Sequence, residues 1–293
     1  MPSISSKIMY KMMKTFKFNQ ILKRDLENNT LKDTSKQPHS YFMRSGNIET
    51  FSTQDHNVYL MTPKTDQTNK WILYLHGGAY VHGFQSFHWR FLRKVMKETG
   101  WNIVAPDYPL LPLSTSKDMY TMIIETYQWL LEHKKPQEII FMGDSAGGGL
   151  ALGLSLVLKK EKRTMPDEII LMSPWLDVTM TDPKVKEIEP FDPILNVDAL
   201  KIVSGMLVKN EDPMNHLFSP LYGDLKDMPH ITIITGTYDL LYADATRIEE
   251  QLTHLDVPYQ MIAYDQMIHT FMFFGLPESS EAIKKVVQTV KDV

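Results

Sequence analysis

The sequence predicts an α/β fold in which a mostly parallel, twisted sheet carries helices on both faces and a helical cap. Residues 71–75 are apolar without a break, as expected of a strand that is buried on both faces. Similar apolar runs recur along the chain with helical segments between them, which is typical of βαβ units. The further strand runs lie at 102–106, 138–141, 168–172, 231–235 and 259–264.

The remaining elements fit the same plan. Helical patterns cover residues 87–99, which Gly100 ends, and residues 116–133. Two short alternating runs, 48–51 and 58–61, predict antiparallel strands at an edge of the sheet. A chain of 293 residues is long enough for one such domain and does not require a second.

Two segments depart from the alternation of strand and helix patterns and are predicted to form the cap. Residues 1–45 begin with a helical pattern and precede the first strand. Residues 182–221 contain five prolines, no strand run and a helix-like centre at 197–208. An insertion of this length in such a fold is typical of a lid. Residues 46–293 would then form the main domain around the insertion.

The composition excludes several classes of function. A net charge of −4 with mixed signs argues against nucleic acid as a partner. The chain has no cysteine, which excludes disulfides, thiolate metal sites and a cysteine nucleophile, and which fits a cytoplasmic protein. No run approaches the roughly 20 apolar residues of a membrane span, so stable membrane insertion is not expected.

The first 18 residues are basic and amphipathic. Lys7, Lys11, Lys14 and Lys17 recur at helical spacing and interrupt the apolar core that a secretory signal would need. A basic amphipathic helix can lie on a membrane surface. Packing over its own domain is the favoured interpretation.

The motif Gly-Asp-Ser-Ala-Gly at 143–147 joins an apolar strand run to a leucine-rich helical segment. Its Gly-x-Ser-x-Gly pattern is typical of a nucleophile elbow, where Ser145 would sit on a tight strand-to-helix turn with its hydroxyl above the sheet. Small neighbours are needed because the turn strains the serine backbone and brings the helix close to the strand. A chance glycine-rich turn would look the same, so the assignment depends on partners elsewhere.

Two such partners follow in the chain. Serine is a weak nucleophile at neutral pH and needs a base, and a third group must fix the tautomer of that base. In open parallel sheets these groups lie at the carboxyl ends of the strands. Asp239 follows the strand run 231–235 and His269 follows 259–264. The order Ser, Asp, His is the order found in α/β hydrolases.

Other acids and histidines fit these roles less well. Asp244 falls inside a helical pattern, and Asp265 is more simply a turn residue beside the histidine. The other candidate bases lie in polar segments, before the nucleophile or outside a strand-end loop (His39, His56, His82, His88, His133, His216, His230 and His254).

The sequence His-Gly-Gly-Ala at 76–79 follows the first buried strand and predicts a site for the negative charge of a tetrahedral intermediate. Gly77 and Gly78 would supply backbone N–H groups to this oxyanion hole, together with Ala146 after the nucleophile. His76 is expected to be a hydrogen-bonded structural residue and not a proton carrier.

Together these motifs resemble those of the hormone-sensitive-lipase-like esterases and lipases of the α/β-hydrolase superfamily. The Asp before the serine and the double glycine after it are specific to this group among hydrolases. The resemblance implies a carboxylic-ester hydrolase with Ser145 as nucleophile, His269 as base and Asp239 as its orienter. It also implies a cap made of the N-terminal helix and the 182–221 insertion. The resemblance covers most of the chain from about Tyr59 and rests on His76-Gly77-Gly78, Asp107-Tyr108, Gly143-Asp144-Ser145-Ala146-Gly147-Gly148, Ser173-Pro174-Trp175, Tyr238-Asp239 and His269.

Three positions depart from the pattern of that group. Ala79 stands where the group usually has a third glycine, and it still offers a backbone donor. Residues 107–113 lack the Arg and Glu of the usual Asp-Tyr-Arg-Leu-Ala-Pro-Glu, which affects the pairing of those charges but not the chemistry at serine. Leu240 replaces the proline that usually follows the catalytic Asp, so that turn is expected to differ.

We therefore predict a carboxylesterase that hydrolyses short- to medium-chain esters through an acyl-enzyme, without a cofactor or metal. Two alternatives stay open: an amidase or formamidase with the same triad, and a non-catalytic ligand receptor on the same fold. A small-molecule ester is the expected partner, and an edge strand or the C-terminal helix could mediate a homodimer. The pocket is expected to be apolar because of side chains in the cap segments (Met9, Met12, Phe16, Phe191, Leu195, Leu200, Met206 and Leu207).

Overall fold

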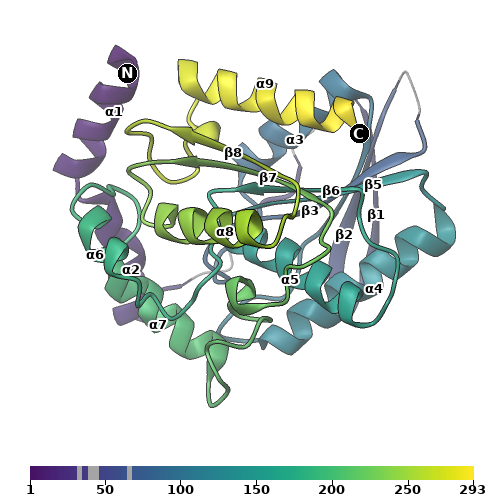
Figure 1. Cartoon of the computed structure of the whole chain (residues 1–293), viewed down its shortest axis with the longest axis horizontal. Helices are drawn as coiled ribbons and strands as arrows, with labels where there is room; N and C mark the ends of the chain where they lie inside the picture. Colours follow the sequence, from purple (N-terminus) through teal and green to yellow (C-terminus); the bar gives the residue numbers. More distant parts are fainter. Residues whose placement is uncertain (32–34, 39–45, 65–67) are drawn as a thin grey trace.

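Eight strands form one sheet in the part of the chain that the computed structural model describes, residues 1–31, 35–38, 46–64 and 68–293. They are β1 (Gly46–Thr53), β2 (His56–Pro63), β3 (Lys70–Leu75), β4 (Asn102–Pro106), β5 (Glu138–Asp144), β6 (Glu168–Met172), β7 (His230–Gly236) and β8 (Tyr259–Tyr264). The strand order is β1-β2-β4-β3-β5-β6-β7-β8 (Figure 1). β1 and β2 pair antiparallel, as do β2 and β4, and the other pairs are parallel. The predicted α/β fold with antiparallel edge strands is confirmed.

Helices cover both faces of the sheet. Successive side chains of a strand point to opposite faces, so Ile233 of β7 joins the core on one face and Ile234 joins the core on the other. This double burial explains the unbroken apolar runs of the central strands. The helices on the first face are α4 (Ser116–His133), α5 (Ala146–Lys160) and α8 (Tyr242–His254), and those on the second are α3 (Ser86–Thr99) and α9 (Pro277–Asp292) (Figure 1).

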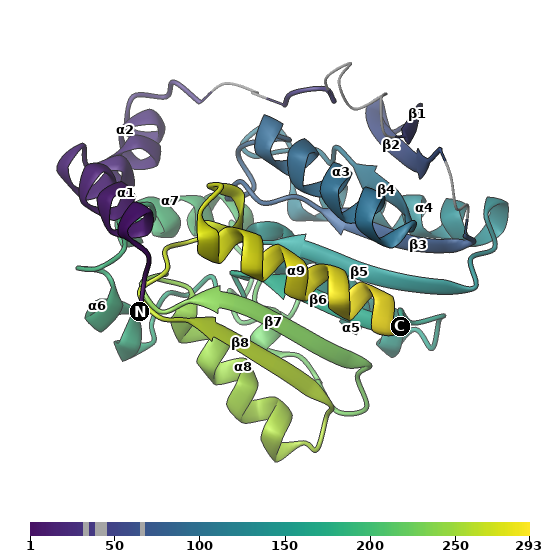
Figure 2. The ribbon, with the colours of Figure 1, turned by 90° about the horizontal axis from the view of Figure 1, so that it is seen from above.

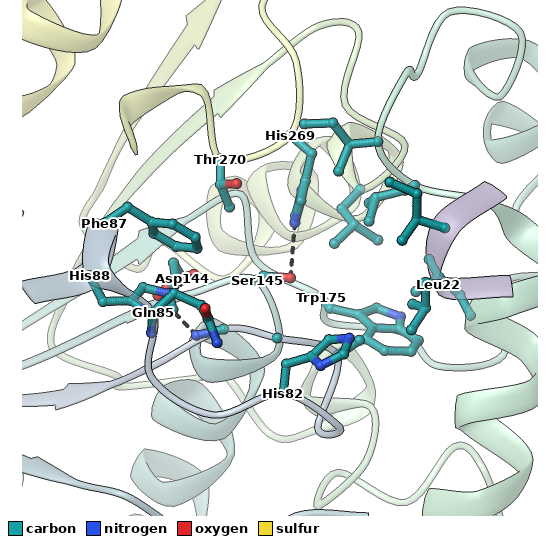
Figure 3. Close-up of a pocket in the computed structure, with 18 of the residues that line it drawn as sticks. Leu22, His82, Gln85, Phe87, His88, Asp144, Ser145, Trp175, His269 and Thr270 are labelled. Atoms are coloured by element: carbon teal, nitrogen blue, oxygen red, sulfur yellow. Dashed lines mark hydrogen bonds and ion pairs between the residues drawn. The ribbon is translucent and has the colours of Figure 1, made fainter. Parts of the chain in front are cut away.

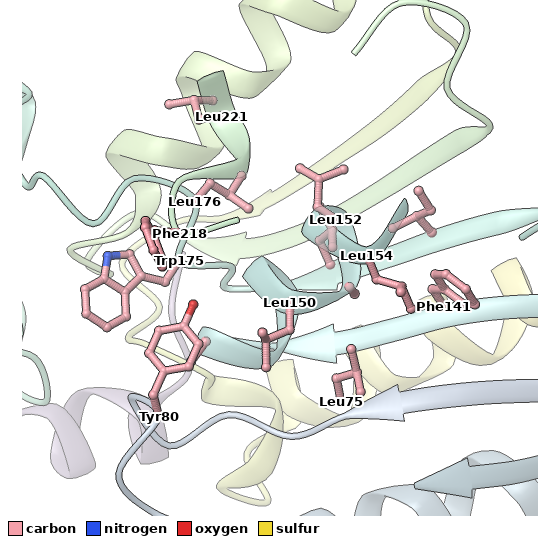
Figure 4. Packing of buried hydrophobic residues seen from close by; sticks show 14 of the residues in the cluster. Leu75, Tyr80, Phe141, Leu150, Leu152, Leu154, Trp175, Leu176, Phe218 and Leu221 are labelled. Atoms are coloured by element: carbon pink, nitrogen blue, oxygen red, sulfur yellow. The ribbon is translucent and has the colours of Figure 1, made fainter. Parts of the chain in front are cut away.

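The helix α5 lies at the centre of the first core. Its leucines 150, 152 and 154 pack among side chains from the sheet and from the segment after β6 (Figure 4). Leu152 and Leu154 are fully buried, and complete burial of such a side chain stabilises the fold by about 1.5–3 kcal/mol. The first turn of α5 lies against the end of β3, since a Cβ atom on Gly147 would be 2.1 Å from the carbonyl oxygen of Leu75.

Helix boundaries follow local signals in the sequence. Gly100 ends α3 with a φ of 76°, the left-handed conformation that glycine adopts readily. Thr115 caps α4, because its side chain accepts the N–H of Asp118 while the Asp118 carboxylate accepts the N–H of Thr115. Among the described residues no helix combines the length and the apolar character that crossing a membrane requires.

The two predicted cap segments lie at the same end of the molecule (Figures 1 and 2). The ammonium of Lys23 is 2.6 Å from the Asp198 carboxylate, and that of Lys14 donates to the Pro190 carbonyl oxygen at 2.6 Å. The N-terminal segment contains α1 (Ile4–Thr15), the single-turn η1 (Phe18–Gln20) and α2 (Ile21–Glu27), and the insertion contains α6 (Pro183–Ile188) and α7 (Val197–Val208).

The helix α7 coincides with the predicted helix-like centre of the insertion, whereas α6 was not predicted. The division into a cap region 1–45, a main domain 46–293 and a lid at 182–221 stays a prediction. Residues 32–34 and 39–45, and with them His39, lie outside the described part of the chain.

We expect Gly147→Ala to destabilise the protein by about 3 kcal/mol. The new methyl group would meet the carbonyl oxygens of Leu75 and His76, which cannot move without shifting the chain at the end of β3. Gly205→Ala in α7 is the matched control, because a Cβ there meets nothing within 4 Å. That change should stabilise by up to about 1 kcal/mol through helix propensity. Thermal denaturation of both variants measures the difference, and equal midpoints would contradict the close approach.

Candidate active site

Ser145 stands on a strained turn between β5 and α5. Its φ of 52° and ψ of −122° lie outside the regions that residues other than glycine usually occupy. Two strand-to-loop contacts hold the residue in place: its N–H donates to the Met172 carbonyl oxygen at 2.9 Å, and its carbonyl oxygen accepts from the Trp175 N–H at 2.9 Å. The predicted elbow geometry is therefore present.

Asp239 and His269 meet Ser145 at the carboxyl ends of the strands. Gly236 at the end of β7 pairs with Tyr264 at the end of β8, so the loops that follow begin side by side. His269 Nε2 is 3.0 Å from Ser145 Oγ, and His269 Nδ1 is 3.0 Å from both carboxylate oxygens of Asp239 (Figure 3). A carboxylate can only accept, so Nδ1 carries the proton and Nε2 is left to accept from the serine hydroxyl.

The competing acids lie in other surroundings. Asp244 is buried in α8, where its carboxylate accepts the N–H groups of Leu176 and Asp177 at 2.8 and 2.9 Å. Asp265 is exposed in the turn after β8. Asp239 is thus the one of the three predicted candidates that bonds to His269.

The charges of three carboxylates affect the pKa of His269. Burial by itself would lower the pKa of this imidazole, but the charges of Asp239, Asp192 and Asp144 act in the opposite direction. The net result is a pKa of His269 above its ordinary value. The imidazolium form, which a general base must pass through, is therefore stabilised at this position.

The three expected oxyanion donors differ in their bonding. The Gly77 N–H, expected to be free for an intermediate, donates to Asp144 Oδ1 at 3.0 Å. The register of the strands explains this contact. Leu75 at the end of β3 pairs with Gly143 of β5, so the residues just after Leu75 lie beside Asp144. Within the described ranges the N–H groups of Gly78 and Ala146 donate to no protein acceptor. Ala146 is the first residue of α5, where an amide has no partner inside the helix.

Asp144 is the centre of a buried hydrogen-bond network that the sequence did not reveal. Besides the Gly77 amide, its carboxylate accepts the Tyr74 hydroxyl at 2.5 Å and lies 3.5 Å from His88 Nε2. Burial would raise the pKa of Asp144, but His88 and the hydrogen bonds lower it below its ordinary value. A carboxylate that stays ionised here fixes the glycine loop beside Ser145.

His76 has the structural role that was expected. It is fully buried, its Nδ1 donates to the Gly77 carbonyl oxygen at 2.8 Å, and its ring stacks on Tyr108 with centroids 4.2 Å apart. Burial, and after it the nearby His88, lower the pKa of His76 to about 3. The imidazole is therefore neutral near pH 7 and forms part of the loop's support.

Asp192 of the insertion is a further buried carboxylate at this site, and sequence reasoning missed it. One of its oxygens accepts the N–H groups of Ile194 and Leu195 at 2.7 and 2.9 Å, and the other accepts the N–H of Leu240 at 2.7 Å. Leu240 follows Asp239, so Asp192 joins the insertion to the turn that carries the predicted catalytic acid. Burial and the neighbouring Asp239 raise the pKa of Asp192 to about 6.

A cavity of about 500 Å³ opens beside Ser145 and His269 (Figure 3). Trp175 and the glycine loop form part of its wall, and both predicted cap segments contribute apolar side chains. Leu195 and Leu200 of the insertion line it, as predicted. The apolar lining residues from the N-terminal segment are Phe18, Ile21 and Leu22, and Lys36 of that segment lines the cavity as well.

Other cap residues expected in the pocket lie elsewhere. Met12 and Phe16 of the N-terminal segment and Phe191 of the insertion are exposed to solvent. Leu207 is buried in the core. The prediction of their place was wrong because helical periodicity identifies apolar positions without showing which of them faces the site.

Known proteins share this fold. A family model described as alpha/beta hydrolase fold matches residues 72–273. The chain belongs to the α/β-hydrolase family. An esterase of Acinetobacter venetianus is 32% identical to this hydrolase over 221 residues, which cover 74% of the chain and 73% of the relative. An acetyl-hydrolase of Streptomyces hygroscopicus is 28% identical over 226 residues, covering 74% of each protein.

The structure of this hydrolase also resembles a solved one across its whole length. An esterase from the bacterial hormone-sensitive lipase family superimposes with a TM-score of 0.85 at 22% identity, covering 100% of the chain and 99% of that protein. This likeness shows the shared fold. The family model over residues 72–273 and the 32%-identical esterase confirm the predicted kinship with the hormone-sensitive-lipase-like esterases and lipases. The predicted class of enzyme, a serine hydrolase of the esterase type, is confirmed as well.

We expect Asp192→Asn to lower the pKa of His269. The negative charge of ionised Asp192 favours the imidazolium form of His269, so removing that charge makes His269 easier to deprotonate. Ring resonances of His269, followed by NMR across pH 4 to 9 and assigned with His269→Gln, measure the shift. Asp198→Asn, at an exposed position of α7, should leave the pKa of His269 unchanged. An unchanged or raised pKa in Asp192→Asn would count against the coupling.

Proposed function

We propose that this hydrolase is a carboxylesterase that acts on short- to medium-chain carboxylic esters, with Ser145, His269 and Asp239 as its catalytic triad. The observation that carries the proposal is the unbroken chain of hydrogen bonds from Ser145 Oγ through His269 to Asp239, beside an open cavity. A serine alone cannot attack an ester at a useful rate near pH 7.

The reaction has two halves. Ser145 Oγ attacks the carbonyl carbon of the ester while its proton passes to His269 Nε2, and Asp239 stabilises the resulting imidazolium. The tetrahedral intermediate collapses to an acyl-serine, and the departing alcohol takes the proton from His269. Water then attacks the acyl-serine with His269 again as base, which releases the acid and restores the serine.

The oxyanion of each intermediate is held by backbone amides in this proposal. Gly78 and Ala146 supply the N–H groups, and such donors typically contribute a few kcal/mol to transition-state stabilisation. The Gly77 amide acts indirectly, because its bond to Asp144 fixes the loop that presents Gly78. Asp144, Tyr74 and His88 are accordingly positioning residues for the oxyanion hole.

The cavity supports the preference for small esters. Its volume of about 500 Å³ lies in the range of ordinary small-molecule sites. Its apolar lining from α2 and the insertion suits an acyl chain, and the name of the Streptomyces relative, acetyl-hydrolase, points the same way. The expected cytoplasmic location and a homodimer stay predictions.

Ser145→Ala should lower kcat for p-nitrophenyl butyrate by at least about 10⁴-fold, because the acyl-enzyme cannot form. Ser155→Ala is the matched control: this buried serine lies on α5, the helix that follows Ser145, and its hydroxyl donates to the Ala151 carbonyl oxygen. It should retain most of the activity, and both variants should keep the native fold by circular dichroism. Near-normal turnover by Ser145→Ala would refute the triad, and faster hydrolysis of the matching anilide by the unaltered enzyme would favour an amidase.

Leu22→Trp should shift the preferred acyl chain toward shorter lengths. Leu22 of α2 lines the cavity, and a larger ring there would fill space that a longer chain needs. We expect kcat/KM for p-nitrophenyl octanoate to fall about tenfold relative to the acetate. Leu26→Trp, one turn further along α2 and outside the lining, should leave this ratio unchanged. An unchanged ratio in Leu22→Trp would show that the acyl chain binds elsewhere.

A further inference from the structure

The outward face of α1 carries an apolar row that no other part of the described chain covers. Ile4, Ile8, Met12 and Phe16 recur every four residues and therefore lie along one side of the helix. Their exposed fractions are 78%, 64%, 45% and 71%. In Figure 2, α1 lies at the periphery of the molecule, away from the sheet. Single exposed apolar residues are ordinary, but a continuous row of four needs an explanation.

The opposite face of α1 is packed on the body, so the helix is fixed and the apolar row is presented to solvent. Met13 is buried, and the ring of Tyr10 lies against Tyr238 with centroids 5.4 Å apart. At the start of the helix, the Ser3 N–H and the Ser6 hydroxyl both donate to the Glu278 carboxylate, at 2.5 and 2.7 Å. The expected packing of this helix over its own domain is therefore observed, but it uses only one side.

A basic strip runs beside the apolar row. Lys7, Lys11 and Lys14 follow it along the helix and Lys17 comes just after, with the Lys14 ammonium also reaching the Pro190 carbonyl oxygen. Residues 1–24 contain six basic side chains and no acidic one. The whole chain has a net charge of −4, so the remainder carries −10. The positive charge is thus concentrated around the exposed apolar row.

This surface leads to the cavity. Phe18 and Ile21, which follow α1 directly, are partly exposed and also line the cavity beside Ser145. A partner that covers the apolar row would therefore lie next to the cavity mouth.

We propose that the outward face of α1, namely Ile4, Ile8, Met12 and Phe16 with Lys7, Lys11, Lys14 and Lys17, binds the surface of an anionic phospholipid bilayer. Helices with one apolar row and flanking lysines bind at such interfaces by burying the apolar side chains at headgroup depth. The lysines are attracted to anionic headgroups, whereas the rest of the protein, at −10, is repelled. Binding is peripheral, and it does not depend on the proposed esterase activity.

A second copy of the chain fits the surface less well. In a two-fold symmetric dimer the same face would meet itself, and the lysine strips of both copies would be brought together. That contact would place eight positive charges near one another, with no acidic side chain among residues 1–24 to offset them. An anionic bilayer can bury the apolar row and also attract the lysines.

Co-sedimentation of the 293-residue chain with vesicles tests the proposal. We expect binding to vesicles of 70% phosphatidylcholine and 30% phosphatidylglycerol in 0.1 M NaCl, and little binding to pure phosphatidylcholine. Binding should weaken at least tenfold in 1 M NaCl, because salt screens the lysines. No binding to the anionic vesicles would overturn the proposal.

Two double variants separate the two contributions. Ile8→Ser with Phe16→Ser should lower the partition coefficient at least tenfold by removing apolar burial. Lys7→Gln with Lys11→Gln should lower it about tenfold and reduce the salt dependence. Leu113→Ser is the matched control, since Leu113 is a 95% exposed leucine outside α1 and should not matter. All variants should hydrolyse p-nitrophenyl butyrate in solution at the unaltered rate.

Three outcomes would contradict the proposal. Vesicle binding that survives both double variants would place the contact elsewhere. Equally strong binding to neutral and to anionic vesicles would show that the lysines do not contribute to binding. A dimer in sedimentation velocity that Ile8→Ser with Phe16→Ser dissociates, without vesicle binding by the unaltered protein, would identify a second copy as the partner. The activity of Ser145→Ala tests the proposed triad alone, and its outcome does not change the interpretation of vesicle binding.

Discussion

The arrangement of the site depends on the strained backbone turn at Ser145. A φ of 52° at a serine costs on the order of 1–3 kcal/mol, so the surrounding chain must fix the turn. The bonds from Ser145 to Met172 and from Trp175 to Ser145 do so on one side. On the other side Gly147 lets α5 begin in contact with the end of β3. With the turn fixed, the register of the parallel strands brings the loops that carry Asp239 and His269 to the same edge of the sheet.

Buried carboxylates surround His269, and their partners determine their charge. Asp144 faces His88, and despite burial its pKa is held below the ordinary value. Asp192 faces Asp239, and burial with this like charge raises its pKa to about 6. Because Asp192 also accepts N–H groups from Ile194 and Leu195, the same carboxylate holds the cavity wall and the turn that carries Asp239, the proposed catalytic acid. The insertion and the proposed triad are therefore linked both by hydrogen bonds and by the charge of Asp192.

The N-terminal segment presents two different surfaces. Its η1 and α2 contribute Phe18, Ile21 and Leu22 to the lining of the cavity beside Ser145. Its outer side concentrates positive charge around an apolar row, in a chain that is otherwise acidic. An enzyme held by this surface would present its cavity mouth close to a lipid layer, where esters of low solubility are concentrated.

Local pattern was enough to predict much of this protein. The unbroken apolar runs identified the parallel strands, and the rule that catalytic groups follow strand ends selected Ser145, Asp239 and His269, which the structure brings within hydrogen-bond distance. Three features could not be read in this way. The Gly77 amide bonds to Asp144, because two strands that are far apart in sequence end in register. Asp192 reaches Leu240 across 48 residues. The helix α1 has apolar residues on two sides, so its periodicity could not show which side packs on the body and which faces solvent. All three features depend on contacts between segments that are far apart in the sequence. Such contacts form only when the chain folds, so local sequence patterns do not show them.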